Sequence, residues 1–419
     1  MTQAVQARHN RARQRAPTNF ASIALLLAAT FIVPGAQAQS GSPAPIRIGV
    51  ISPLTGASSD FGTSMKEGAA LAVDQINSIG GVLGRPLQLV AEDDGGDAEK
   101  GKAASSDLLE HQNVVATIGF CNTGVALGSI GSFETKQQLL IIPCAQGTVL
   151  TRRKPAAEST IFRVAPADVL NAEFLVAEMV DRRKMTRVAI IADKTGYGDG
   201  GVADITAGLK RRGLEPVAVS RFAADAKSLR ENLGQAKAAD AQALVVYTVG
   251  PGEAAAVRAR AAMKWDVQFF APWTLSFRSV LDVAGAAALE GTMMTQTIIQ
   301  DSANEARTAF IASFAKRPGH QPVGSLMAAA QAYDSVNLLV RAMFASHGDY
   351  SPVALKKALE NPTEPYRGVV TTYDHPFSEK DHEAFSINMI WLGVWRRGEI
   401  HYFHADDALM SGAVRHKQQ

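Results

Sequence analysis

The chain of 419 residues has only two cysteines, few aromatic residues and no marked excess of charge of either sign. Apolar residues make up 47% and charged residues 20%, which excludes a disulfide-stapled, collagen-like or disordered chain and indicates a globular protein with a packed core. Lys and Arg number 42 against 40 Asp and Glu, but four arginines lie in an acid-free N-terminal segment: Arg8, Arg11, Arg13 and Arg15. A near-neutral body without a basic run gives no support for nucleic-acid binding.

The usual catalytic motifs are also absent. The sequence contains no G-x-S-x-G, Walker A or H-E-x-x-H, so it lacks the motifs that are typical of hydrolases and nucleotidases. Two histidine groups come late in the chain, near loops or the tail, and we interpret them as solvated surface, not as a metal site: His401 with His404 and Asp406, and His375 with His382. No histidine lies close in sequence to Cys121, as a cysteine nucleophile would need. We therefore expect a non-enzyme without metal or cofactor.

Long apolar runs are missing except at the N-terminus. A basic stretch over 8–15, an apolar run over 20–33 and the small-residue sequence Ala36-Gln37-Ala38 predict a signal peptide over 1–38, cleaved near Ala38. A membrane anchor is the alternative, but the run is shorter than the ~20 residues that span a bilayer as a helix. The prediction places the mature protein in the periplasm.

Apolar strands alternate with segments of helical periodicity from residue 46 onward. One series of predicted strands and helices runs over 46–142, a second over 168–264, and later strands over 369–373 and 387–395 have no sheet of their own. Such βαβ repetition predicts an α/β fold with two doubly wound parallel-sheet lobes. We expect lobe 1 to comprise 46–167 and 297–383, lobe 2 to comprise 168–296 and 384–405, and 406–419 to form a tail. Several chain crossings would then form a hinge.

Small polar and aromatic residues follow successive predicted strands. Ligands of open parallel sheets lie beyond the carboxyl ends of the strands, where helix N-termini offer N–H groups. We expect Asn122, Thr123 and Gln146 to hold a carboxylate. We expect Phe61, Tyr197 and Trp273 to surround the apolar part of the ligand. Tyr247 is expected in the same site. Each alone is compatible with an ordinary N-cap or loop residue, and only their recurrence after successive strands favours a binding site.

A dinucleotide site is the enzymatic alternative. The segment 196–201 matches G-x-G-x-x-G between a predicted strand and a helix, and Glu215 lies 19 residues beyond Gly196. The ribose-binding acid should end the following strand, whereas Glu215 precedes it. A NAD-binding enzyme is therefore the weakest of the functions considered.

The order and spacing of many short motifs between about residue 46 and residue 400 resemble the periplasmic branched-chain (Leu/Ile/Val-type) amino-acid binding proteins. The motifs are Ile46-Arg47-Ile48-Gly49-Val50, Pro53-Leu54-Thr55-Gly56, Phe61-Gly62, Gly80-Gly81, Asp93-Asp94, Phe162-Arg163, Tyr197-Gly198-Asp199-Gly200 and Ala332-Tyr333-Asp334. The resemblance implies a type I periplasmic binding fold. It also implies the extracytoplasmic solute-binding component of an ABC importer, with a permease in the inner membrane as partner. A sensor that presents its ligand to a membrane receptor is the alternative.

The resemblance also implies roles for single residues. Asn122, Thr123, Gln146 and the backbone of Cys144 match the family's carboxylate-binding loops, where Ser and Thr are usual. Phe61 and Tyr197 match aromatic residues of the site, and Asp168 matches the acid that faces the ligand ammonium.

One departure concerns the ligand. Where the family places a glutamate after Gly-Pro, this sequence has Ala271-Pro272-Trp273. An ammonium with fewer acidic partners is poorly stabilised. The expected ligand is therefore a branched-chain or other hydrophobic amino acid, or an aromatic or aliphatic acid or amide.

The two cysteines leave two alternatives open. Cys121 and Cys144 each follow a predicted strand, and neighbouring strands would bring them near enough for a disulfide in an exported protein. Two unlinked buried thiols are the other interpretation. The bridge known in the family uses a cysteine near residues 94–97, which this chain lacks.

Overall fold

Two separate β-sheets, each covered by helices on both faces, form the body of the protein. The computed structural model describes residues 43–300, 305–317, 323–410 and 415–418, and the chain from Pro43 onward forms one unit. The signal peptide predicted over 1–38 lies outside the described residues.

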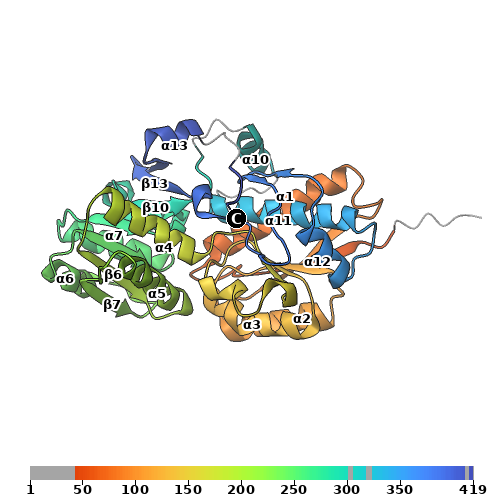
Figure 1. Cartoon of the computed structure of the whole chain (residues 1–419), viewed down its shortest axis with the longest axis horizontal. Helices are drawn as coiled ribbons and strands as arrows, with labels where there is room; N and C mark the ends of the chain where they lie inside the picture. Colours follow the sequence, from red (N-terminus) through yellow and green to blue (C-terminus); the bar gives the residue numbers. More distant parts are fainter. Residues whose placement is uncertain (1–42, 301–304, 318–322, 411–414, 419) are drawn as a thin grey trace, which may run out of the picture. The chain divides into compact units, whose positions relative to one another are not determined.

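The first sheet has five parallel strands in the order β2-β1-β3-β4-β5. Its strands are β1 (Ile46–Ser52), β2 (Leu87–Asp93), β3 (Ala116–Gly119), β4 (Leu140–Ile142) and β5 (Ile161–Arg163). Helices α1 (Ser59–Ser78) and α11 (Leu326–Ala345) pack together on one face. Helices α2 (Ala98–Glu110) and α3 (Thr123–Lys136) pack together on the other face (Figure 1).

The second sheet has seven strands in the order β14-β13-β10-β9-β8-β6-β7. Its parallel strands are β6 (Val188–Asp193), β7 (Ala218–Phe222), β8 (Ala243–Tyr247), β9 (Gln268–Ala271) and β10 (Met293–Gln296). The late strands β13 (Trp391–Arg396) and β14 (Glu399–Tyr402) extend its edge in antiparallel pairing. The second sheet is therefore parallel except at this edge.

The helices of the second sheet divide between its two faces. Helix α4 (Asp168–Val176), continued by a π-helical turn over Ala177–Arg182, lies with α5 (Gly196–Lys210) on one face. Helices α6 (Arg230–Ala238) and α7 (Pro251–Ala262) cover the other face. The short helices α8 (Arg278–Ala284) and α9 (Ala286–Leu289) pack on α7.

Alternating burial explains why these segments form strands with two covered faces. In β6 every residue is buried, and its successive side chains enter the apolar clusters of opposite faces: Ala189 and Ile191 on one, Val188 and Ile190 on the other. Continuous apolar strands are typical of parallel sheets with helices on both faces. This is the pattern from which the sequence predicts the α/β fold, and the prediction is confirmed.

The late part of the chain returns to both sheets. Helix α11 packs on α1 of the first sheet, and α12 (Pro352–Glu360) packs on α11, whereas β13 and β14 join the second sheet. The strand expected over 369–373 is instead a separate two-stranded pair, β11 (Tyr366–Arg367) and β12 (Thr372–Tyr373). Helix α10 (Glu305–Ala315) precedes α11.

The described residues of the segment expected to be a tail contact the rest of the protein. Helix α13 covers Ala405–Met410, the Arg415 guanidinium lies 3.5 Å from the centre of the Trp391 ring, and Lys417 pairs with Asp381 at 2.7 Å. Cation–π and ion-pair contacts therefore bind the described end of the chain to the fold.

Candidate functional site

Each sheet has a topological switch point, and the two switch points contribute to one cavity. Within each sheet the parallel strands follow the order 2-1-3-4-5, so the connections diverge between β1 and β3 and between β6 and β8. Crevices at such points are the usual ligand sites of open α/β sheets. A cavity of about 250 Å³ is lined by loops that follow strands of both sheets.

Seven of the nine predicted site residues line this cavity. They are Phe61, Asn122, Thr123, Cys144 and Gln146, which follow strands of the first sheet, and Tyr197 and Trp273, which follow strands of the second. Two predicted residues, Asp168 and Tyr247, are fully buried and do not line the cavity. They lie behind its wall, where the Tyr247 hydroxyl donates to an Asp168 carboxylate oxygen at 3.0 Å.

The N-terminus of α3 faces the cavity. Asn122 is the N-cap residue, but its side chain accepts no hydrogen bond from the helix and instead donates to the Ser58 hydroxyl at 3.0 Å. Thr123, Gly124 and Val125 of the first turn also line the cavity. The first turn of a helix has unpaired N–H groups and partial positive charge, so this end of the cavity suits an anion.

The N-terminus of α5 lies close to the first turn of α3 and has a side-chain cap of its own. The Thr195 hydroxyl accepts from the backbone N–H groups of Tyr197 and Gly198. Because one helix end is capped and the other is not, the geometry favours the α3 end for a carboxylate.

Several polar atoms around the cavity are buried without a hydrogen-bond partner among the described residues. They are Asn122 Oδ1, Gln146 Nε2, Asp168 Oδ2, the Tyr197 hydroxyl and Glu253 Oε2. Buried polar groups are almost always paired, because an unpaired one costs about 1–3 kcal/mol. Such a concentration at one cavity is typical of a site whose hydrogen bonds are completed by a ligand.

Two buried acids stand beside a cavity lined only by uncharged residues. Burial raises the pKa of Asp168 to about 7, against the weaker opposing effect of the Tyr247 hydrogen bond. Burial also raises the pKa of Glu253 well above its ordinary value. A cation brought next to these carboxyl groups would favour their charged form.

Sequence reasoning missed Glu253. It lies in the first turn of α7, within the loop-and-helix segment Gly250-Pro251-Gly252-Glu253, and accepts a hydrogen bond at 2.9 Å from Thr274, which lines the cavity. A buried carboxyl group therefore lies behind Thr274, although Trp273 occupies the position at which the family places a glutamate. The signal was present: Glu253 follows β8 and comes two positions after the pair Gly250-Pro251.

Aromatic rings form one part of the cavity wall. The ring centres of Phe61 and Trp273 lie 5.9 Å apart in an edge-to-face arrangement, and Phe277 packs against both. Phe61 belongs to α1 of the first sheet and Trp273 follows β9 of the second. The wall is therefore apolar and suits an aliphatic or aromatic body.

Packing accounts for the glycines of the G-x-G-x-x-G match. A Cβ atom at Gly198 would lie 2.1 Å from the Asp193 carbonyl oxygen, and one at Gly201 would lie 2.2 Å from ring atoms of Tyr247. Close approach of α5 to β6 and β8 thus requires these glycines, and no phosphate-binding role is needed to explain them.

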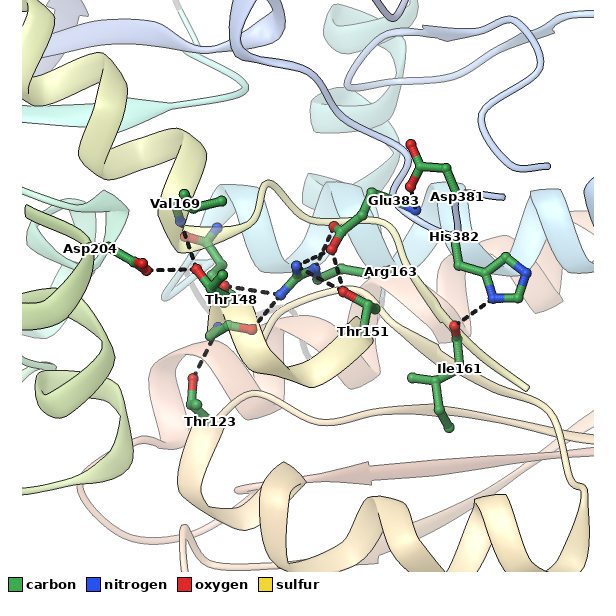
Figure 2. Close-up of polar contacts among 12 residues, drawn as sticks. Thr123, Thr148, Thr151, Ile161, Arg163, Val169, Asp204, Asp381, His382 and Glu383 are labelled. Carbon is green, nitrogen blue, oxygen red and sulfur yellow. Dashed lines mark hydrogen bonds and ion pairs between the residues drawn. The ribbon is translucent and has the colours of Figure 1, made fainter. Parts of the chain in front are cut away.

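Arg163 connects the cavity loop to the crossover between the sheets. It is fully buried at the end of β5, and its guanidinium donates to the carbonyl oxygens of Gln146 and Gly147 at 3.0 and 2.7 Å. The same guanidinium pairs with Glu383 and donates to the Thr151 hydroxyl (Figure 2). Arg163 thus fixes the loop that carries Cys144 and Gln146.

A second contact in Figure 2 joins elements of the two sheets. The Thr148 hydroxyl, in the loop after β4, donates to the Asp204 carboxylate of α5 at 2.6 Å and accepts from the Val169 N–H at 2.8 Å. The loop that carries Gln146 is therefore tied to both the crossover and the second sheet.

The two cysteines are free thiols in the structure, so the disulfide alternative does not describe it. The thiols are buried and in hydrogen-bonding contact with each other. This matches the interpretation of two unlinked thiols.

The structure places the histidines of the two groups in different surroundings. His382 is buried, where it stacks on Phe162 and contacts Glu360 at 2.9 Å, so its expected solvated position is wrong. His404 lies 3.2 Å from Glu178. Within the described residues no three His, Cys, Asp or Glu side chains are placed to share a metal ion. A search of the same residues finds no helix with the length and hydropathy to cross a membrane.

The family model for periplasmic binding protein matches residues 45–398, which is most of the chain. The chain belongs to the periplasmic binding protein family. This family consists of binding proteins and not of enzymes, which confirms the non-enzymatic interpretation of the sequence.

Similar curated proteins carry Leu/Ile/Val-binding names. The chain is 31% identical to Leu/Ile/Val-binding protein homolog 3 of Brucella melitensis over 50% of this chain and 56% of that protein. It is 27% identical to homolog 2 of Brucella abortus over 85% of this chain and 92% of that protein. The chain spans about half the length of the first of these relatives.

Solved structures of the family share the fold. A type 1 periplasmic binding protein from Bordetella pertussis superposes with a TM-score of 0.76 at 24% identity, covering 85% of this chain and 99% of that one. A Streptococcus pneumoniae branched-chain amino-acid substrate-binding protein, solved with isoleucine, gives 0.74 at 20% identity, with coverages of 85% and 98%. A solute-binding protein of an ABC transporter from R. palustris, solved with benzoate, gives a TM-score of 0.73 at 18% identity, with coverages of 86% and 95%. These likenesses establish a type I periplasmic binding fold.

Proposed function

We propose that this protein is the extracytoplasmic solute-binding component of an ABC importer and that it encloses one small carboxylate-bearing solute. The observation that carries the proposal is the cavity between strand ends of the two sheets, into whose surroundings several unpartnered polar atoms converge. The family match and the binding names of the relatives support it. An inner-membrane permease is the partner this role requires.

A hydrophobic α-amino acid is the ligand that the arrangement favours. Its carboxylate would lie at the uncapped N-terminus of α3, its ammonium group near the buried carboxyl groups of Asp168 and Glu253, and its side chain against Phe61 and Trp273. Opposite charges at the two ends of one small cavity match the two charges of a zwitterion.

An aromatic carboxylic acid is the second candidate. The aromatic wall and the uncharged lining favour it, and a structural neighbour was solved with benzoate. It would leave Asp168 and Glu253 without a cationic partner, so these acids would have to stay protonated.

A thermal-shift screen over amino acids, aromatic acids, short aliphatic acids and amides tests the proposal. A ligand at 100 times its dissociation constant stabilises the folded state by about 2.7 kcal/mol. We expect hydrophobic amino acids to raise the melting temperature most. No shift with any member of the panel would contradict the proposed ligand class.

Two further assays separate the importer from the other functions considered. Copurification of the protein with its permease, together with solute uptake that depends on both, is expected for an importer. Uptake that does not need the protein would favour a sensor. A fluorescence titration with NAD is expected to show no binding.

A further inference from the structure

Three sulfur atoms meet in the wall of the ligand cavity. Cys121 follows β3, Cys144 follows β4, and both line the cavity. Met65 comes from α1, and its Sδ lies 3.6 Å from Cys121 Sγ. The two thiols contact each other, and the three side chains are at most 5% exposed.

This donor set is chemically soft. Thiolate and thioether sulfurs select soft cations such as Cu(I), whereas carboxylate, carbonyl and water oxygens suit Mg²⁺ and Ca²⁺. A metal–sulfur bond of about 2.3 Å places two ligating sulfurs roughly 4 Å apart, close to the sulfur separation observed here. Among the described residues no set of three His, Cys, Asp or Glu side chains could complete a zinc-type site.

The charge of the surroundings favours a monovalent ion. Both thiols are buried. The nearby Asp94 is also buried, and its Oδ2 has no hydrogen-bond partner among the described residues. A monovalent cation that replaces one thiol proton leaves the net charge of this buried region unchanged.

We propose that Met65, Cys121 and Cys144 form a binding site for a soft monovalent cation, Cu(I) or its analogue Ag(I), in the wall of the ligand cavity. On binding, one metal–sulfur bond forms, one S–H bond breaks, and the proton passes to solvent without any oxidation or reduction. The second thiol and the thioether act as neutral donors. Since both cysteines line the cavity, the bound cation would also change the affinity for a solute.

Competition against a chromophoric Cu(I) chelator under anaerobic conditions, with the whole chain in reduced form, tests the site. We expect one Cu(I) per chain, bound in competition with the chelator. Cys121→Ser and Cys144→Ser are each expected to lower the affinity by about 100-fold and Met65→Leu by about 10-fold, the range found when metal sites lose a supporting group.

Two controls keep the result interpretable. Met343→Leu replaces a methionine that is equally buried, in α11, and is expected to leave Cu(I) affinity unchanged. Cys144→Ala repeats the thiol loss without adding a hydroxyl, and the melting temperature of each variant shows whether it folds.

Three outcomes would overturn the site: no competition by the reduced protein, Cu(I) affinity that stays at the wild-type level in Cys121→Ser and Cys144→Ala, or closure of the two thiols to a disulfide that persists under the assay's reductant. The Cu(I) titration contains no organic solute, so its failure would not affect the proposed solute-binding function. A negative thermal-shift screen would in turn not affect the proposed Cu(I) site.

Discussion

Tyr197 is one of the polar side chains that elements of the second sheet contribute to the cavity. It follows β6, is almost fully buried, and its hydroxyl has no hydrogen-bond partner among the described residues. Tyr197→Ala is expected to weaken solute binding tenfold or more, about 1.4 kcal/mol, because the wall loses both its ring and its hydroxyl. Isothermal titration calorimetry with the best solute of the screen measures this.

Tyr350→Ala is the matched control, since Tyr350 lies outside the cavity and contacts Arg85. It should leave affinity unchanged. An affinity of Tyr197→Ala equal to that of the wild type would remove Tyr197 from the site.

Asp168 makes the two ligand classes distinguishable by pH. Its pKa is raised from 3.8 to about 7 in the folded protein, so an ammonium ligand that needs its charged form should bind about tenfold more weakly for each pH unit below 7. An aromatic acid without an amine should show no such loss. Asp168→Asn should abolish the pH dependence, while Asp282→Asn, at an exposed ion pair, should keep it. Calorimetric titrations from pH 5 to 8 would contradict the assignment if amino-acid affinity stayed level.

The same shift has a consequence for folding. An acid whose pKa is raised in the folded state contributes most to stability below its unfolded value of 3.8, and this contribution is lost as pH rises to about 7. The pH dependence that Asp168 gives to the free energy of unfolding should therefore disappear in Asp168→Asn, which denaturant unfolding at several pH values measures.

Helix α5 packs against the second sheet through glycine. A Cβ atom at Gly201 would lie 2.2 Å from ring atoms of Tyr247, whereas one at Gly200 would meet nothing within 4 Å. Gly201→Ala should destabilise the protein by about 1–3 kcal/mol through overpacking. Gly200→Ala should be neutral or stabilise by up to about 1 kcal/mol, because alanine favours a helix interior. Denaturant unfolding of the two variants tests this, and equal stabilities would contradict the packing account.

The end of β5 and the loop after β4 depend on Arg163. Arg163→Lys cannot reproduce its contacts to two carbonyl oxygens, Thr151 and Glu383, and should cost about 3–5 kcal/mol, as expected for breaking a buried ion pair. Arg278→Lys, in an exposed pair with Asp282, should change stability by less than about 1 kcal/mol. Thermal unfolding that is equally affected in both variants would show that the Arg163 contacts do not support the fold.

Regular elements were predictable where one periodicity covers a whole segment. Strand β6 is an apolar run and helix α3 begins after the N-cap residue Asn122, so both elements are determined locally. The antiparallel edge of β13 and β14 was not predictable, since β13 pairs with β10 about a hundred positions earlier in the sequence, and β14 then pairs with β13. Asp168 and Tyr247 were expected to line the cavity, but other side chains cover them. The sequence shows which loop or strand end a side chain belongs to, but not which other side chains cover it.

The molecule as a whole connects two sheets through several chain segments. The crossover after β5, the segment after β10 and the segment that runs from Glu383, beside β5, to β13 each pass from elements of one sheet to elements of the other. We propose lobe boundaries at these segments, with 46–167 and 297–383 in one lobe and 168–296 and 384–405 in the other. Such multiple connections suit hinge motion, by which a solute that prefers the closed arrangement would shift the protein toward it.

The central claim is that one solute is held by both sheets at once. A crystal structure with the best solute of the thermal-shift screen tests it most directly. The account predicts density in the cavity, with a carboxylate at the first turn of α3 and the same molecule in contact with Tyr197 and Trp273. A solute bound to one sheet alone, or outside this cavity, would contradict it.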